Sequence, residues 1–372
     1  RIGMSNNDHL QDLGQRFELG LKHHQAGNLN LAVSTYREIL SIEPQHADAL
    51  HLLGEALYRL GQFDESLFNL NRAIEVSPHH FYLNTRGIVF LEYGYLLEAE
   101  QDLRRAIKVL PNYLEAHINL SNVLRKKGDF KNAKKYGELA VKLDPNSAAA
   151  WNALGAQQME SAKLDEAIAS FDKALSLAPQ ALVTIKNKAK ILVVQKKWQE
   201  AIPLLQSAIG LQDFEVFSML SRAYYIVGEV EKAIDPFIEA MRVSNPVIRK
   251  NYFSALEGVE HVIAMCDALG VYRSNFSAVA ELYQLAIEAL PEHTTLINNL
   301  AVSQFNQSIY DKSVENLRRL LELDPGNVQA RTNLGVSLIM LDRSEEAIAE
   351  FDIALKHDPQ FLAAAGTLFS CL

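Results

Sequence analysis

The sequence predicts an all-α solenoid, in which about ten helical hairpins stack one after another along the chain. Three observations lead to this prediction. Prolines recur every 33 or 34 residues, small residues recur with the same period, and the apolar residues between them follow the spacing of helices. The chain has 372 residues and is 48% apolar, so it can bury a continuous core.

Prolines mark the ends of the predicted hairpins. Proline lacks an N–H and disfavours helix in the residue before it, so each of these prolines is expected to end a second helix. They occur in two runs, which are Pro44, Pro78, Pro111, Pro145 and Pro179, and then Pro291, Pro325 and Pro359. The sequence therefore predicts repeats of 34 residues, or one residue fewer.

Each repeat is predicted to hold two helices. Apolar and small residues at i, i+3, i+4, i+7, i+10 and i+11 form one helical stripe, as they do from Leu164 to Leu175. Short turns such as 127–129, Lys-Gly-Asp, separate the two stripes, and glycine there can take the left-handed conformation that ends a helix. Small residues such as Ala167 and Ala174 recur because closely crossing helices need room where their backbones approach.

The residues of one repeat resemble a known family. The segment 151–155, Trp-Asn-Ala-Leu-Gly, followed by Ala167, Phe171, Ala174 and Pro179, resembles the tetratricopeptide repeat. The resemblance extends over nearly the whole chain and implies a right-handed superhelix with an inner groove lined by the first helices. The ten repeats in this frame are 13–46, 47–79, 80–113, 114–147, 148–181, 182–213, 214–245, 260–293, 294–327 and 328–361.

The repeat spacing breaks between the seventh and eighth repeats. Asn245 followed by Pro246 is typical of an N-cap and a first helical position, so we expect an extra helix there. Arg86 and Lys188 also stand where a large apolar residue is usual. The predicted organisation is a tail at 1–12, repeats one to seven at 13–245, an irregular segment with an extra helix at 246–259, repeats eight to ten at 260–361, and the first helix of a truncated or capping repeat at 362–372.

The two ends of the chain lead to two expectations. The last residues, 361–372, are apolar and carry no charge, whereas the final repeat of a solenoid needs a polar outer face. We therefore expect the natural chain to continue. The first residues have no apolar core typical of a signal peptide, and the chain has only two cysteines, so we expect a cytoplasmic location.

The sequence offers little chemistry. It contains no GxGxxG, GxxxxGK[ST], HExxH, GxSxG or CxxC motif, and its adjacent histidine pairs diverge on a helix. We therefore expect no enzyme within this chain, no catalytic residues, no metal site and no cofactor. A net charge of −9 argues against nucleic acid as a general partner, and no apolar run is long enough to span a membrane.

The candidate binding residues come from the groove positions that the family resemblance implies. They are Asn119, Asn122, Arg125, Lys126, Asn152, Lys186, Asn187, Lys190, Arg222 and Tyr225, with Asn298, Asn299, Phe305 and Asn333 in the same slots further on. Residues 181–199 carry five lysines and no acid in an otherwise acidic chain. Ammonium groups pair with carboxylates, and asparagine amides can both donate to and accept from an extended backbone. The alternative is that these are solvated helix faces.

Three functions follow from this interpretation. The first is a protein-interaction scaffold that binds an extended, acidic peptide segment in the groove of repeats four to seven. The second is the substrate-recognition arm of a larger protein glycosyltransferase-like enzyme with its catalytic domain beyond Leu372, because the groove asparagines resemble the array of O-linked N-acetylglucosamine transferases. The third is end-to-end self-association through the C-terminal helix. The carboxylate clamp of chaperone-binding members is not reproduced, since Ile118 and Ala153 occupy two of its positions.

Overall fold

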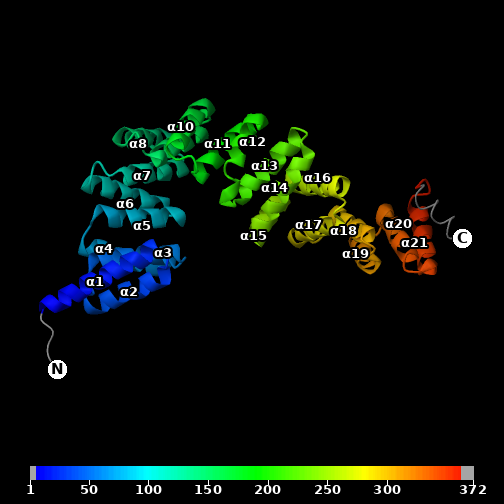
Figure 1. Ribbon diagram of the computed structural model, residues 1–372, viewed down its shortest axis with the longest axis horizontal. Coiled ribbons are helices and arrows are strands. Elements are labelled where there is room, and N and C mark those ends of the chain that lie inside the picture. Colours follow the sequence, from blue (N-terminus) through cyan, green and yellow to red (C-terminus); the bar gives the residue numbers. More distant parts are fainter. Residues whose placement is uncertain (1–5, 362–372) are drawn as a thin grey trace, which may run out of the picture. The chain divides into compact units, whose positions relative to one another are not determined.

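A computed structural model of the chain describes residues 6–361, which fold into helices and turns with no strand between those bounds (Figure 1). The described residues divide into two compact units, one ending at Ile191 and the other starting at Leu192. This boundary lies near the end of α11 (Leu182–Val194). The prediction of an all-α solenoid is confirmed.

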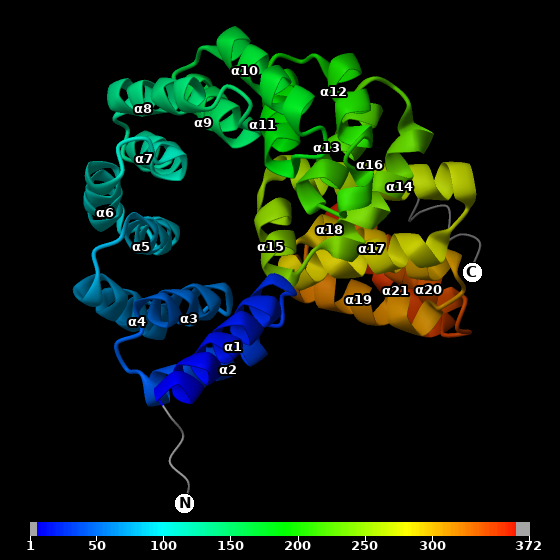
Figure 2. The same cartoon turned by 60° about the vertical axis from the view of Figure 1, so that its left-hand side comes forward.

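The first unit is a regular series of antiparallel helix pairs. Its helices are α1 (Asn6–Gln25), α2 (Leu29–Ile42), α3 (Ala47–Arg59), α4 (Phe63–Val76), α5 (His80–Glu92), α6 (Leu96–Val109), α7 (Leu114–Lys126), α8 (Phe130–Leu143), α9 (Ala148–Glu160) and α10 (Leu164–Leu177). Successive helices pack against each other, and the first helix of a repeat also contacts the first helix of the next, as α7 does α9. In Figure 2, α5 and α7 lie on the inner side of an arc and α6 lies on its outer side.

The second unit continues the hairpins with more irregular elements. They are α12 (Trp198–Gln206), a 3₁₀ turn η1 (Ile209–Leu211), α13 (Phe214–Ile226), α14 (Val230–Val243), α15 (Pro246–Ser254), α16 (Leu256–Arg273), α17 (Phe276–Ala289), α18 (Thr294–Asn306), α19 (Tyr310–Leu323), α20 (Val328–Ile339) and α21 (Ser344–His357). Pro203 lies inside α12 and Pro236 inside α14, where each removes a helical N–H donor.

The small residues of the repeat are buried where the paired helices cross. Ala99, Ala133 and Ala167 are fully buried, and a Cβ added to Gly155 would lie 2.7 Å from the ring of Phe171. A larger residue at Gly155 would therefore require the Phe171 ring to move, which agrees with the close helix crossing predicted from the sequence. One apolar cluster runs without interruption from Leu50 to Ala133, so neighbouring hairpins share a core.

Several boundaries differ from those expected. Helix α1 begins at Asn6, inside the segment 1–12 that was expected to be a tail. Asn245 caps α15 by accepting from the N–H of Ile248 at 2.9 Å, and Pro246 is the first residue of that helix. The chain then bends at Ala255, and α16 begins at Leu256 rather than at the predicted start of repeat eight. The helix predicted at 362–372, and self-association through it, lie outside the described residues.

Candidate peptide-binding surfaces

Asparagine side chains join the first helices of neighbouring repeats. In each case one Asn amide donates to the amide oxygen of an Asn in the preceding repeat, 35 residues earlier. The three pairs, which we call amide rungs, are Asn119 to Asn84 at 3.0 Å, Asn187 to Asn152 at 3.5 Å, and Asn333 to Asn298 at 3.0 Å. Each rung uses one donor and one acceptor, so amide groups remain for a ligand.

The rung at Asn152 has a second donor. The hydroxyl of Thr184 donates to the same amide oxygen at 3.1 Å, so α9 and α11 are joined by two side chains. His51 and Thr85 form an equivalent contact between α3 and α5 at 2.8 Å. In the first unit, polar side chains on neighbouring first helices therefore contact one another, and these include several residues that were predicted to face the groove.

The basic residues of α7 lie beside an acid. The Arg125 guanidinium donates to the Glu160 carboxylate of α9 at 3.2 Å, whereas Lys126 is exposed and Asn122 is half-buried. A carboxylate ligand at Arg125 would have to compete with Glu160. This neighbour was not considered in the sequence prediction, because it belongs to the next repeat.

The lysines of α11 do not all point the same way. Lys188 pairs with Asp172 of α10 at 2.5 Å, which explains how a charged residue occupies a slot that is usually apolar. Lys186 is half-buried and Lys190 is exposed, and each makes an interaction within the structure. The local excess of lysine is thus partly used in holding helices together.

The last two predicted residues belong to the second unit. Arg222 forms an ion pair with Glu257, which lowers the pKa of that carboxyl group. Tyr225 is 43% exposed, and its ring centroid lies 6.2 Å from that of His261. The predicted continuous band over repeats four to seven is therefore distributed over two units, with eight of its ten residues in the first.

A buried polar network lies beside Arg222. His261 is buried, and its Nε2 lies 3.1 Å from the Ser221 hydroxyl while its Nδ1 lies 2.7 Å from the Tyr252 hydroxyl. Burial, with the nearby Arg222 charge, lowers the pKa of His261 to about 4. Ser221 is fully buried and also donates to the Ala233 carbonyl, so the network is structural rather than a nucleophile open to substrate.

A cavity in the second unit was missed by the sequence analysis. It has a volume of about 410 Å³ and lies between α16, α17 and α18. Its lining is formed by Cys266, Asp267, Gly270, Val271, Phe276, Val279, Tyr283, Asn299, Val302, Ser303 and Asn306. Gly270 and Ser303 contribute small side chains to this lining, and a Cβ at Gly270 would approach only the Phe276 ring, at 3.7 Å.

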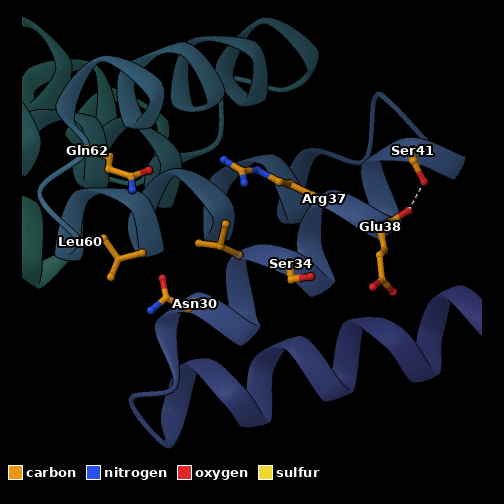
Figure 3. A pocket seen from close by; sticks show the side chains of 8 residues that line it. Asn30, Ser34, Arg37, Glu38, Ser41, Leu60 and Gln62 are labelled. Atoms are coloured by element: carbon orange, nitrogen blue, oxygen red, sulfur yellow. Dashed lines mark hydrogen bonds between the residues drawn. The ribbon is translucent and has the colours of Figure 1, made fainter.

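A larger cavity, of about 490 Å³, lies between α2, the second helix of the first repeat, and the turn that joins α3 to α4 (Figure 3). Figure 3 shows Asn30, Ser34 and Arg37 around an open space, with the Ser41 hydroxyl on the Glu38 carbonyl. The corresponding residues of repeats nine and ten, from Asp311 to Arg343, line a similar cavity of about 450 Å³. Arg37 pairs with Glu65, as Arg318 does with Glu346. This cavity thus recurs as a furrow between stacked repeats, and nothing about it singles out a ligand.

No cluster of three or more His, Cys, Asp or Glu side chains that could hold a metal ion occurs among the described residues, 6–361. None of the helices that the structure describes is long and apolar enough to cross a membrane.

Comparison with known proteins identifies the family. Tetratricopeptide repeat models match residues 23–82, 114–147, 148–180 and 298–360. The chain belongs to the tetratricopeptide repeat family. It is thus a scaffold of the kind that mediates protein–protein interaction.

Curated relatives are similar over most of this chain. Human DnaJ homolog subfamily C member 3 is 21% identical over 93% of this chain and 66% of its own length. The bovine BBSome complex member BBS4 is 25% identical over 74% of this chain and 56% of its own length. Human protein O-mannosyl-transferase TMTC3 is 25% identical over 71% of this chain and 28% of its own length. The chain thus spans two thirds or less of these relatives.

A solved structure is similar in fold. A tetratricopeptide repeat protein from Parabacteroides merdae aligns with a TM-score of 0.52 at 16% identity, over 74% of this chain and 99% of its own. This likeness supports the α-solenoid alone.

Proposed function

We propose that the chain is a non-catalytic interaction scaffold whose first unit binds an extended, acidic peptide segment along α7, α9 and α11. The observation that carries the proposal is the pair of amide rungs at Asn119 and Asn152, flanked by Arg125, Lys126 and Lys190. Amides that bind each other can also bind a peptide backbone, while basic side chains select acidic ones.

The affinity should be modest and sensitive to salt. Exposed ion pairs contribute roughly 0–1 kcal/mol each, and salt screens them. Arg125 already contacts Glu160, and Lys186 and Lys190 have contacts of their own, so an acidic ligand would exchange one partner for another. We therefore expect micromolar rather than nanomolar binding from a few such contacts.

Charge reversal on α11 tests this proposal. Two fluorescein-labelled dodecapeptides of Gly and Ser, one with four central glutamates and one with four glutamines, serve as probes. The wild-type chain should prefer the glutamate peptide, and K186E/K190E should weaken that binding about 5- to 10-fold. The matched control is K142E/K173E, which makes the same charge change at exposed positions of the second helices α8 and α10.

Two results would contradict the proposal. One is equal binding of the glutamate and glutamine peptides by the wild-type chain. The other is an equal loss of affinity for the glutamate peptide in K186E/K190E and K142E/K173E. That result would mean that only the net charge of the protein matters, and not the position of the lysines. Circular dichroism of each variant checks that the array remains folded.

A second candidate is the recognition arm of a longer protein glycosyltransferase-like enzyme. Two observations favour it: the amide rungs on the first helices, and similarity to a relative named as a protein O-mannosyl-transferase. Sequencing the parent reading frame beyond Leu372 tests it. A stop codon directly after that residue, or a continuation without a catalytic domain, would remove this candidate.

We also propose a cytoplasmic location. The proposal rests on the scarcity of cysteine, since two cysteines in 372 residues favour a reducing compartment. Fractionation of cells expressing the parent gene tests it, and recovery with secreted or organellar markers would contradict it.

A further inference from the structure

The cavity between α16, α17 and α18, which we call the α16–α18 pocket, has a polar floor whose groups already have partners. The Tyr283 hydroxyl accepts from the Asn299 amide at 3.3 Å, and the Ser303 hydroxyl donates to the Phe276 carbonyl at 2.9 Å. The Cys266 thiol is buried, which raises its pKa to about 12, and it points to the Val279 carbonyl at 3.9 Å. The floor therefore supplies shape and not reactivity.

The walls of the pocket are largely apolar. Val271 is 78% exposed and Val302 is 39% exposed, and Phe276 and Val279 belong to the same lining. An aliphatic chain entering this space would cover the two valines and release water from them. The pocket is thus suited to the stem of a long side chain.

Asp267 is the only charged residue of the lining. Neither a lysine nor an arginine forms an ion pair with it anywhere in the side chains described, 12–361. Asp267 is an exposed residue, but its carboxyl group still loses part of its water at the cavity, and this raises its pKa because no cation compensates for the loss. A positive group brought by a ligand would offset that loss.

A second, smaller cavity adjoins the first. It has a volume of about 110 Å³, is lined by Val302, Phe305, Asn333 and Val336 among others, and shares Val302 with the α16–α18 pocket. The amide rung from Asn333 to Asn298 lies beside it. An extended chain could therefore place one side chain in each cavity while its backbone passes the rung amides.

We propose that the α16–α18 pocket binds an arginine or lysine side chain of an extended partner segment, with the aliphatic stem against Val271 and Val302 and the charged head at Asp267. A small aliphatic side chain of the same segment occupies the adjoining cavity. The selected ligand is thus basic, opposite in charge to the one proposed for the first unit. The inference shares with that proposal only the premise that first helices bind peptide.

The experiment compares arginine with its uncharged isostere. The probes are two fluorescein-labelled dodecapeptides of Gly, Ser and Val that differ only in a central arginine or citrulline. Fluorescence polarisation with the wild-type chain should show about 5-fold tighter binding of the arginine peptide. In D267N this preference should fall to less than about 2-fold, while V302W should weaken both peptides by filling the pocket.

The matched control is E281Q, which removes one exposed charge from α17 outside the pocket lining. E281Q should keep the arginine preference. Equal affinity of the two peptides for the wild-type chain, or equal loss of preference in D267N and E281Q, would overturn the proposal. Binding of the glutamate peptide to the first unit, measured in parallel, separates failure of this pocket from failure of peptide binding altogether.

Discussion

The regular repeats from α3 to α10 and the irregular segment from α12 to α16 use the same hairpin but end their helices in different ways. In the regular run, prolines follow the second helices and glycines such as Gly61 and Gly128 take positive φ in the turns. In the irregular segment, Pro203 and Pro236 lie inside helices, and a short extra helix is inserted at 246–254. Buried Ala201 and Ala233 still lie where the paired helices cross in the irregular segment. The comparison therefore teaches that helix packing within a hairpin is kept even when the residues that end the helices change.

The largest difference should appear when a methyl group is added at a close approach in each region. A Cβ at Gly258 would lie 2.1 Å from the Tyr252 carbonyl oxygen, which is backbone at the bend between α15 and α16. In the regular run, a Cβ at Gly155 meets the ring of Phe171, a side chain that can shift. We expect G258A to cost about 3 kcal/mol or more and G155A about 1–2 kcal/mol, measured by urea unfolding.

The control for this pair is G210A, since a Cβ at Gly210 meets no atom within 4 Å. It should change the unfolding midpoint little. If G155A proved as damaging as G258A, the ring of Phe171 would be as immovable as the backbone, and the distinction between the two regions would be lost.

Arg86 and Lys188 break the apolar pattern at the same slot in two repeats, but with different burial. Arg86 makes two hydrogen bonds to Asp102, at 2.6 and 2.8 Å, and the Asp102 side chain is only 4% exposed. Asp172, the partner of Lys188, is 53% exposed. R86L should therefore cost about 3 kcal/mol by leaving a buried carboxylate without its main partner, and K188L less than about 1 kcal/mol.

Thermal and urea unfolding of both leucine variants measure this difference. The double variant R86L/D102L should recover most of the stability, because it removes the buried charge together with its partner. Equal effects of R86L and K188L would show that burial of the acid does not decide the outcome.

The irregular segment should also respond to acid through His261. Its pKa in the folded chain is about 4, below the usual 6.5, so folding favours the neutral ring. This contribution is fully present above pH 6.5 and is lost as the pH falls toward 4, because the unfolded chain binds the proton first. Arg222, Glu257 and Tyr252 line the cavity beside the ring.

The stability difference between the wild-type chain and H261Q should therefore shrink by roughly 2 kcal/mol between pH 8 and pH 5. Melting curves at both values measure it. A difference that stays constant with pH would mean that His261 titrates normally in the folded chain.

The smallest expected effect concerns the turns between the paired helices. Ala162 adopts φ of 58°, in the turn position where Gly61 adopts 76°. Alanine is strained there and glycine is not, so A162G should raise the free energy of unfolding by about 0.5–1 kcal/mol. Urea unfolding measures it, with A150G inside α9 as a control that should destabilise instead. A loss of stability in A162G would show that the turn strain is negligible.

Sequence periodicity was sufficient to predict the fold, because each repeat buries its small residues for the same local reason. Within one repeat, Pro179 marks the end of the second helix and buried Ala167 marks the helix crossing. The partners of the groove residues could not be predicted in the same way. Glu160 meets Arg125 and Asp172 meets Lys188 across repeat boundaries, where side-chain direction decides the pairing.

The α16–α18 pocket was harder to anticipate. The pocket depends on small residues in its lining, such as Gly270 and Ser303, and no sequence motif marks the space that they leave. The division at Ile191 was likewise not visible, because the repeat pattern continues through α11 without interruption. Both the pocket and the boundary between the units depend on how repeats pack against each other, and the periodicity within one repeat carries no information about that packing.

The length of each amide rung depends on the distance between two neighbouring first helices, and so on the local curvature of the array. A hydrogen bond of this type is strong at about 2.7–3.2 Å, so tilting two neighbouring first helices apart by about an ångström breaks the rung between them. The rung between Asn187 and Asn152 is already the longest of the three, at 3.5 Å. A ligand that bound its amides in place of the rung would remove this restraint, so we expect occupancy and local bending of the first unit to change together.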